Sequence, residues 1–507
     1  MNKKSVLYGA SILTLGSLIT RILGAFYRIP LTRVLGAVGT GMYQMVFPIY
    51  ALFIVLSTSG MPLAISKLIA NSSVSIYDKK KIIKKFLLGI VALSLLLALV
   101  LCSTCTLIAR AQGNADLYKN YLVISPAIIF VGIISVLRGY FQGEQNYKPT
   151  AISQIVEQIV KIGVGLALAF SLKKYGVEYA VLGAIIGVTA SEFVACIVLF
   201  AQYKKNMRGV VYSSVTTCRA STEPVMKTIM PILVYSILMP LSNVIDSLVV
   251  VNILKRNFTT EIATAMYGIE SGAVSSLVNL PMVLSFALAS AILPNIANIK
   301  DDEMRKPVIA QTLKINMMII LPCTLGLILF SKPIIALLYG RSLNLSTLSG
   351  ERLAVSILAM SAVGVFYMSF VQIFSAILQG IGRSKVVVRN LVIALILKYL
   401  VQTTLLFIPD INIYGLVIGN LVCYVTVFML NVSAVRDYLT LENNAFNKQF
   451  LSIILSFSLG YCIYYFIHNI YGFIFALLFI IFSYFLSLQI FGEINIKKLQ
   501  IIKIKNK

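Results

Sequence analysis

Two arginines in the first long apolar stretch of the chain are well suited to bind an anion. Arg21 and Arg28 are seven residues apart, which is about two turns of an α-helix and places both side chains on roughly one face. A charge inside a membrane span is costly and usually faces a cavity or a partner. We therefore expect Arg21 and Arg28 to line an anion-binding cavity. The alternative is that Arg28 extends to the membrane surface, or that both arginines pair with acids.

Two lysines lie deep inside other apolar stretches. Lys161 is about eleven residues into the stretch 150–171, hence roughly 16 Å from its end at 1.5 Å per residue. Glu157 precedes it by four residues, a spacing at which the two charges could neutralise each other on a helix. Lys398 occupies the equivalent depth in the stretch 386–408 without an acid at that spacing. We expect both lysines to be further anion ligands, with the Glu157–Lys161 pair as the alternative for Lys161.

Four acidic residues lie well inside apolar stretches, and they allow two interpretations. They could carry a coupled proton or cation, or they could be counter-ions of the basic residues. The four are Glu157, Glu192, Asp246 and Glu270.

Other chemistry has little support in the sequence. It contains no GxxxxGK[ST] phosphate-binding loop, which excludes ATP hydrolysis by that route. Cys102 and Cys105 form a CxxC inside an apolar stretch, but there is no second such pair and only one histidine. Because a zinc site needs four convergent ligands, we predict no metal, cofactor or redox centre.

The elements that must hold these residues are transmembrane helices. The chain has 507 residues, of which 59% are hydrophobic and only 12% charged, whereas soluble domains are about 45–50% apolar and about 25% charged. Stretches long enough to cross about 30 Å of hydrocarbon predict about fourteen helices in an all-α membrane protein. A bend is expected after the first of them, because Pro30 and then Gly36, Gly39 and Gly41 follow. The stretches are 6–27, 42–69, 86–109, 119–141, 150–171, 178–201, 226–252, 265–298, 308–331, 353–378, 386–408, 412–434, 449–468 and 470–491.

The net charge of +25 is distributed in short gaps between these stretches. Such charge sets topology and attracts anionic lipids rather than nucleic acid. The basic gap around Lys79–Lys85 and the lysine-rich C-terminus predict that both termini are cytoplasmic, in the cell membrane.

The sequence also contains an internal repeat. Residues 141–161 and 378–398 align so that Gln142-Gly143 matches Gln379-Gly380 and Lys161 matches Lys398. The repeat spans six helices, an even number, so the two halves have the same orientation; transporters of this kind bind substrate between two lobes. A GxxxG at 183–187 and another at 415–419 predict a close helix approach in each lobe. The expected divisions are an N-terminal lobe 1–205, a basic linker 206–224, a C-terminal lobe 225–436, and two further helices with a basic tail, 437–507.

Several stretches of the N-terminal half resemble the stage V sporulation protein B family. They are TRILGAFYRIPLTRVLGAVGTGMYQMVFPIYALF, GMPLAISKLIA, SVLRGYFQGEQNYKPTAISQIVEQIVK and YGVEYAVLGAIIG. This family is in the polysaccharide-flippase branch of a superfamily that also holds multidrug extruders and lipid II flippases.

The resemblance implies flipping of an undecaprenyl-pyrophosphate-linked saccharide for peptidoglycan, particularly spore cortex, in a sporulating Gram-positive bacterium. Cell-wall synthesis proteins are the partners it implies. The arginine motif of the lipid II flippases matches at Arg21 and, after one inserted residue, at Arg28. A dianionic pyrophosphate also suits arginine, which binds phosphate through two parallel hydrogen bonds.

Three alternatives remain open at this stage. An exporter of cationic drugs with the same fold would depend more on Glu192 or Asp246 than on the arginines. A membrane-embedded enzyme acting on the same lipid would need a catalytic acid reachable from one surface. A scaffold without transport activity would tolerate Arg28→Ala.

Overall fold

The computed structural model describes most of the chain. The described residues are 3–58, 60–70, 76–207, 223–345, 349–439, 443–467 and 469–491, and for 3–15, 76–78, 223–235 and 443–446 the backbone alone is described. The predicted linker 206–224 lies mostly outside these ranges, and so does the basic tail after residue 491. Within them the protein is helical, without strands.

The first half of the chain forms one lobe. Its helices are α1 (Lys3–Thr58), α2 (Met61–Ile69), α3 (Ile76–Ala111), α4 (Tyr118–Gly143), α5 (Lys148–Leu172) and α6 (Val177–Asn206). Pro149 sits in the first turn of α5, where its missing N–H has no helical partner to lose.

The second half forms the other lobe and a C-terminal pair of helices. Its helices are α7 (Glu223–Leu254), α8 (Thr260–Gly268), a π-helical turn (Ile269–Val274), α9 (Ser275–Asn298), α10 (Asp302–Leu329), α11 (Ser331–Leu338), α12 (Gly350–Gly380), α13 (Ser384–Leu406), α14 (Tyr414–Val435), α15 (Asn443–Phe466) and α16 (Ile470–Ile490). α8, the π-turn and α9 run on as one long apolar segment, Thr260–Asn298.

The bend in α1 is at Gly36 and not at Pro30. The helix continues through Pro30, and its one non-helical residue is Gly36, with φ 69° and ψ −174°. A residue with a side chain is strained at this positive φ, whereas glycine adopts it readily. The break divides α1 into two membrane-spanning limbs, and the second continues into α2 after Gly60. The thirteen described candidate spans, of which the first covers Gly16–Ile69, therefore correspond to fourteen crossings, as predicted.

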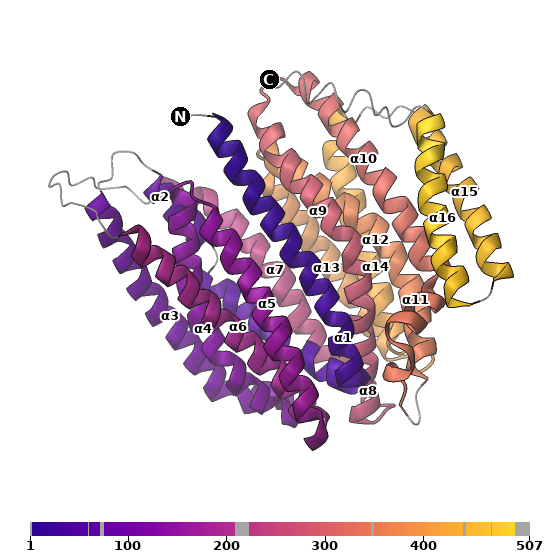
Figure 1. Ribbon diagram of the computed structural model, residues 1–507, viewed down its shortest axis with the longest axis horizontal. Coiled ribbons are helices and arrows are strands. Elements are labelled where there is room, and N and C mark those ends of the chain that lie inside the picture. The colour runs from indigo at the N-terminus through magenta and orange to yellow at the C-terminus, as the bar shows by residue number, and fades with distance from the viewer. Residues whose placement is uncertain are drawn as a thin grey trace.

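The packing of helices repeats between the two lobes. In the first lobe α3 packs on α4, α4 on α6, and α5 on α6; in the second lobe α10 packs on α12, α12 on α14, and α13 on α14. The first limb of α1 lies against α5 as α7 lies against α13. The internal repeat in the sequence is thus a repeat of structure. Figure 1 shows the first lobe on the left, the second on the right, and α1 crossing the front between them.

The paired GxxxG motifs bring two helices together at the same place in each lobe. A Cβ on Gly187 of α6 would lie 2.3 Å from the Cα of Gly165 on α5. A Cβ on Gly419 of α14 would lie 2.7 Å from the Cβ of Gln402 on α13. Both distances are too short for any side chain, so the predicted close approach is confirmed in both lobes.

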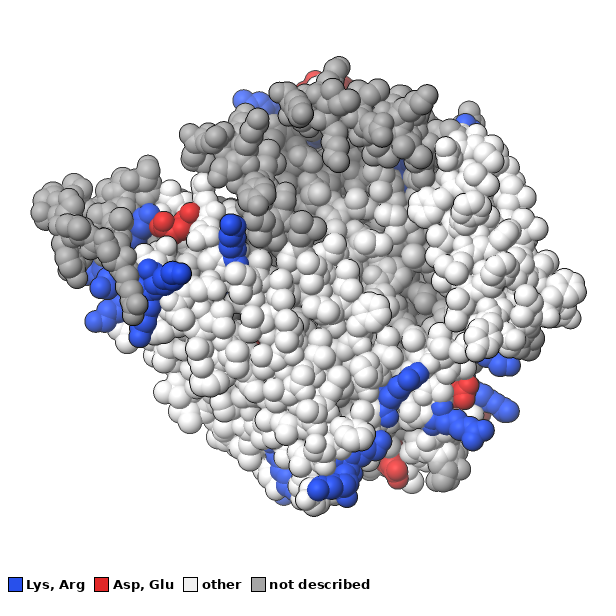
Figure 2. Space-filling view, in the orientation of Figure 1, with Lys and Arg blue, Asp and Glu red and all other residues white. Residues whose placement is uncertain are grey.

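The surface fits a multi-pass membrane protein. Figure 2 shows Lys and Arg gathered at two opposite ends of the molecule, with a broad band of uncharged side chains between them. Many large apolar side chains of the long helices are exposed, for example Phe170 of α5 at 73% and Phe482 of α16 at 68%. Such a band is stable against hydrocarbon but not against water. The start of α1 and the end of α16 lie at the same end of the molecule (Figure 1).

The lobes touch most closely at the end of the molecule opposite the start of α1. A Cβ on Gly41, in the second limb of α1, would lie 2.0 Å from the carbonyl oxygen of Thr264 on α8. Near the same end, the Arg33 guanidinium donates to the carbonyl oxygens of Leu337 and Leu338, which are the last residues of α11. These contacts join the first lobe to the second there.

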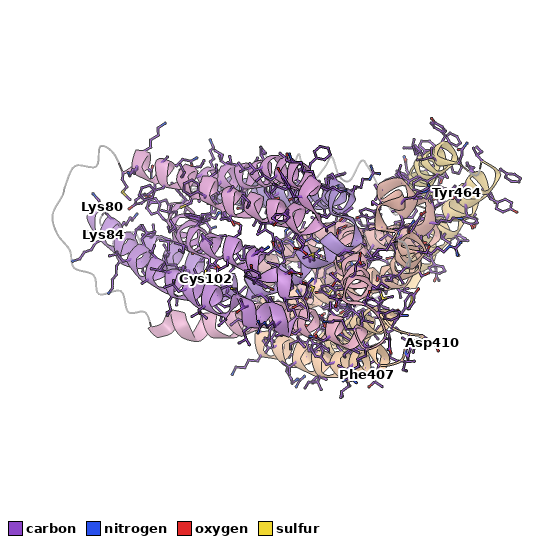
Figure 3. The ribbon with its side chains drawn as sticks, turned by 90° about the horizontal axis from the view of Figure 1, so that it is seen from below. Lys80, Lys84, Cys102, Phe407, Asp410 and Tyr464 are labelled. Carbon is purple, nitrogen blue, oxygen red and sulfur yellow. The ribbon has the colours of Figure 1, made fainter. Side chains whose placement is uncertain are left out.

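The helices α15 and α16 are an appendage on the second lobe. They pack on each other and touch α10 and α11. Figure 3 shows Tyr464 of α15 at the far end of the molecule from Lys80 and Lys84 of α3. The pair is therefore remote from the face where the two lobes meet.

Candidate functional site

Three adjoining cavities lie between the lobes beside α1. The largest, about 480 Å³, is lined by Arg21, Arg28 and Lys161 and is called here the cationic cavity. A second, about 340 Å³, is lined by Arg28, Asp246 and Glu270 and is called the mixed cavity. A third, about 310 Å³, is lined by Arg21 and is called the flanking cavity. The cationic cavity thus shares Arg28 with one neighbour and Arg21 with the other.

The cationic cavity gathers three of the four predicted anion ligands. Arg21 and Arg28 come from the first limb of α1 and Lys161 from α5, which packs against it. Within the described part of the chain, no acid lies within ion-pair distance of any of the three. Lys161 lies near the ring of Phe47, with its Nζ 5.4 Å from the ring centroid. Three cations in one membrane cavity, with no acid at ion-pair distance in the described structure, attract an anionic ligand.

Amide side chains complete the wall of this cavity. Gln158 lies on α5 between Glu157 and Lys161, and Gln372 comes from α12 of the second lobe. Their side-chain oxygens are buried, and neither has a hydrogen-bond partner in the described structure. A buried amide left without a partner costs about 1–3 kcal/mol. These groups are therefore suited to the hydroxyl and amide groups of a polar ligand.

Glu157 does not pair with Lys161. Its Oε2 is 2.9 Å from the Nη2 of Arg138 on α4, and the Arg138 Nε also donates to Ser153 on α5 at 3.2 Å. Glu192 of α6 is also close to this pair. Its carboxyl interacts electrostatically with Glu157, Arg138 and Lys161. Neither glutamate lines one of the three cavities.

Lys398 is not with the other three cations. It is buried, and its Nζ lies 2.6 Å from Asp246 Oδ2 on α7. The other carboxylate oxygen of Asp246 accepts from Gln402 Nε2 at 2.9 Å. Lys398 also donates to Ser242 at 3.3 Å. The acidic partner of this buried lysine is therefore Asp246. The ion pair joins α7 to α13.

The mixed cavity combines one cation with two acids. Asp246 contributes to its wall but is already held by Lys398 and Gln402. Glu270, in the π-helical turn, receives one long hydrogen bond from Asn420 of α14, at 3.4 Å. Short π-helical turns within α-helices are frequent at functional sites. Arg28 stands at the boundary of this cavity with the cationic one.

Four residues in or near the cavity walls were not predicted from the sequence: Gln154, Gln158, Arg138 and Phe286. Gln154, Gln158 and Lys161 follow the spacing i, i+4, i+7 on α5, a polar stripe that could have indicated a cavity-facing side. Arg138, in the predicted span 119–141, could have been recognised as an intramembrane charge. Phe286, which contacts Arg21 across the lobes, gives no signal in the sequence. Within the described residues, no group of three or more His, Cys, Asp or Glu could hold a metal.

Comparison with known proteins identifies relatives over most of the chain. The model of the family described as "Polysaccharide biosynthesis protein" matches residues 6–300. Stage V sporulation protein B of Bacillus subtilis (strain 168) is 27% identical over 459 residues, covering 87% of this chain and 86% of that protein. Lipid II flippase MurJ of the same organism is 28% identical over 429 residues, covering 79% of this chain and 77% of that protein.

Solved structures with the same fold are also found. A structure titled "Lipid II flippase MurJ, inward closed conformation" superposes with a TM-score of 0.70 at 18% identity, covering 95% of this chain and 98% of that one. An inward-facing multidrug resistance MATE family transporter of the MOP superfamily superposes with a TM-score of 0.63 at 17% identity, covering 84% and 98%. At these identities the likeness establishes the fold.

Proposed function

The chain belongs to the polysaccharide biosynthesis protein family, and we propose that it flips an undecaprenyl-pyrophosphate-linked saccharide across the cell membrane. One observation carries this proposal: Arg21, Arg28 and Lys161 line one cavity between the lobes, with no acid at ion-pair distance among the described residues. A lipid diphosphate carries the negative charge that such a cavity stabilises, and arginine binds phosphate through charge-assisted hydrogen bonds.

The rest of the cavity wall favours a saccharide on the diphosphate. Gln158 and Gln372 present side-chain oxygens without partners in the described structure, and Asn279 lines both the cationic and the mixed cavity. Hydroxyl and acetamido groups of a sugar would satisfy these amides. A hydrocarbon or a simple inorganic anion would leave them unpaired, which is unfavourable in a buried site.

The arrangement of the lobes supports transport by alternating access. The lobes repeat each other with the same orientation, and transporters of this type expose a central site first to one side and then to the other. In this structure the lobes meet closely at Gly41 and Thr264, whereas the cationic and flanking cavities extend along α1 toward its start. We place both termini in the cytoplasm, following the excess of Lys and Arg there. The cavity then faces the side on which lipid-linked precursors are made.

For the substrate we propose a peptidoglycan precursor, and the names of two relatives support this choice. Those names concern sporulation and lipid II, which supports a peptidoglycan precursor, in particular one for spore cortex. Export coupled to an ion gradient or to the membrane potential agrees with the lack of an ATP-binding loop in the sequence. Anionic membrane lipids and cell-wall synthesis proteins remain the proposed partners.

A second function, export of cationic small molecules, is favoured by Glu270 in the mixed cavity. The fold is shared with a multidrug transporter. In that case Glu270→Gln would abolish transport of an organic cation, while Arg28→Gln would have little effect. The flippase proposal predicts the opposite order of effects on a lipid-linked saccharide.

The proposal is tested by translocation in proteoliposomes. Purified protein is reconstituted with fluorescent lipid II, and the fraction that reaches the far leaflet is measured with a membrane-impermeant quencher. We expect faster translocation than in protein-free vesicles and a loss of about 10-fold or more with Arg28→Gln, because a hydrogen bond to a charged group contributes about 1.5–3 kcal/mol.

The matched control is Arg256→Gln, because Arg256 lies over the ring of Phe407 and lines none of the three cavities. This variant should translocate like the wild type. Folded and inserted protein that gives no translocation of lipid II or of other undecaprenyl-linked saccharides would refute the proposal.

A further inference from the structure

The guanidinium of Arg21 is held by an aromatic ring of the opposite lobe. Its Cζ lies 3.8 Å from the centroid of the Phe286 ring. Arg21 is on the first limb of α1 and Phe286 is on α9, so this contact crosses from one lobe to the other. A cation over an aromatic face at this distance is a favourable cation–π interaction.

The pair stands at the boundary between two cavities. Arg21 and Phe286 both line the cationic cavity and the flanking cavity, and so does Val283, one turn before Phe286 on α9. The flanking cavity also has Gln154 in its wall, whose buried side-chain oxygen has no hydrogen-bond partner in the described residues. The stacked pair is therefore part of the wall of both cavities.

An anion can displace Phe286 from Arg21, because their contact is a cation–π interaction and not an ion pair. A cation–π contact is weaker than an ion pair, because a ring neutralises no charge. A diphosphate offers Arg21 charge-assisted hydrogen bonds that are about twice as strong as neutral ones. An acid at position 286 would hold the arginine against such a ligand, whereas phenylalanine releases it.

We propose that Phe286 is a positioning residue that holds Arg21 as a latch between α1 and α9, and that an anionic diphosphate head group opens the latch by taking the guanidinium from the ring. This inference rests on the proposed function for the nature of the anion. Opening the latch removes one of the contacts between the lobes and joins the flanking cavity to the cationic cavity. A neutral lipid has no means of displacing the ring and leaves the latch closed.

The sequence offers a direct way to observe the latch, because it contains no tryptophan. Phe286→Trp introduces a single indole that preserves the cation–π contact, since tryptophan is the strongest aromatic partner of a cation. The variant is reconstituted in nanodiscs and titrated with undecaprenyl pyrophosphate or with neutral undecaprenol. We expect the pyrophosphate to change the indole emission of this variant in a saturable manner and undecaprenol to leave it unchanged.

Two controls locate the response. Arg21→Gln in the Phe286→Trp background should abolish it, because the indole then has no cation to lose. Phe193→Trp places a single indole at an exposed residue of α6 that lines none of the cavities, and its emission should not respond. A response of the Phe286→Trp indole that persists unchanged after Arg21→Gln would overturn the proposal.

The same preparation separates the latch from the proposed function. Wild-type protein that translocates lipid II, combined with Phe286→Trp emission that does not respond to the pyrophosphate, refutes the latch and leaves the flippase proposal standing. Phe286→Trp emission that responds through Arg21, in a protein that translocates no lipid-linked saccharide, supports the latch and refutes the flippase proposal.

Discussion

The two lobes place a lysine at the same position of the repeat and use it differently. Lys161 on α5 faces the cationic cavity with no acid at ion-pair distance in the described structure. Lys398 on α13 is buried against Asp246 at 2.6 Å. In the first lobe the nearby acid, Glu157, is held by Arg138. One lysine is therefore available to a ligand, and the other is part of the structure.

The two lobes also differ at matching positions of the helices around these lysines. Where the first lobe has Arg138 bonded to Ser153, the second has Ser375 and Asn390 at the matching positions. Those two are joined through Asn431, which accepts from Asn390 at 2.9 Å and donates to Ser375 at 3.2 Å. The second lobe thus links these positions through amides and a hydroxyl, with Arg389 donating to Asn390 Oδ1 at 3.3 Å, where the first lobe has the Arg138–Glu157 ion pair. A repeated charge therefore acquires its role from its partners rather than from its position.

The largest expected effect is on stability, from Lys398→Met. The substitution leaves the Asp246 carboxylate buried without its cation, and removal of one partner of a buried pair costs about 3–5 kcal/mol. We expect a large fall in the thermal unfolding midpoint in detergent, with Lys161→Met close to wild type. The double variant Asp246→Asn/Lys398→Met should recover most of the loss. Equal destabilisation by both lysine substitutions would contradict the different roles of Lys161 and Lys398.

The next effect is on ligand binding. Lys161→Gln should weaken the binding of undecaprenyl pyrophosphate by about 10-fold, because it removes one charge-assisted contact, and unfolding stability should change little. The double variant Asp246→Asn/Lys398→Met should bind like the wild type. Native mass spectrometry or ligand-induced thermal stabilisation measures the binding of undecaprenyl pyrophosphate by each variant. Weaker binding in the double variant than in Lys161→Gln would place the anion site in the other lobe.

Substitution of the glycines at the close helix contacts should lower the unfolding stability by an intermediate amount. Gly187→Ala puts a Cβ 2.3 Å from the backbone of Gly165, and overpacking of this kind costs about 1–3 kcal/mol. Gly419→Ala meets Gln402 at 2.7 Å and should cost less, although it also displaces the amide that holds Asp246. Unfolding midpoints of the two variants test this order. Gly89→Ala is the control, because a Cβ added at Gly89 would have no neighbouring atom within 4 Å.

The smallest effect concerns Arg138. In Arg138→Met, Glu157 loses its partner and can turn to Lys161, four residues along the same helix. We expect translocation to slow by about 2–5-fold, which corresponds to about 0.4–1 kcal/mol. The further substitution Glu157→Gln should restore the rate. A rate that stays low in the double variant would show that Arg138 acts on the ligand directly.

The sequence predicted the architecture because its signals are local. Long apolar stretches and matched glycines determined the helices and the repeat, and these are properties of neighbouring residues. The bend was expected from Pro30 onward, yet it falls at Gly36 alone, because a proline can remain within a membrane helix whereas the positive φ at the break requires glycine.

The partners of charges could not be predicted in the same way. Lys398 and Asp246 are 152 residues apart in sequence, and their contact depends on how α7 packs against α13. The spacing of Glu157 and Lys161 indicated a helical pair, but Arg138 on another helix competes successfully for the glutamate. Arg21, Arg28 and Lys161, which the sequence predicts as anion ligands, line one cavity. The contact of Arg21 with Phe286 depends on the fold and has no signal in the sequence.

Whether the first lobe holds the anion site is tested directly by a cryo-electron microscopy structure with a bound undecaprenyl-pyrophosphate-linked saccharide. We expect the diphosphate to lie within hydrogen-bond distance of Arg28 and Lys161, with Lys398 still paired with Asp246. A diphosphate bound by Lys398 in the second lobe, with Lys161 unoccupied, would contradict this expectation.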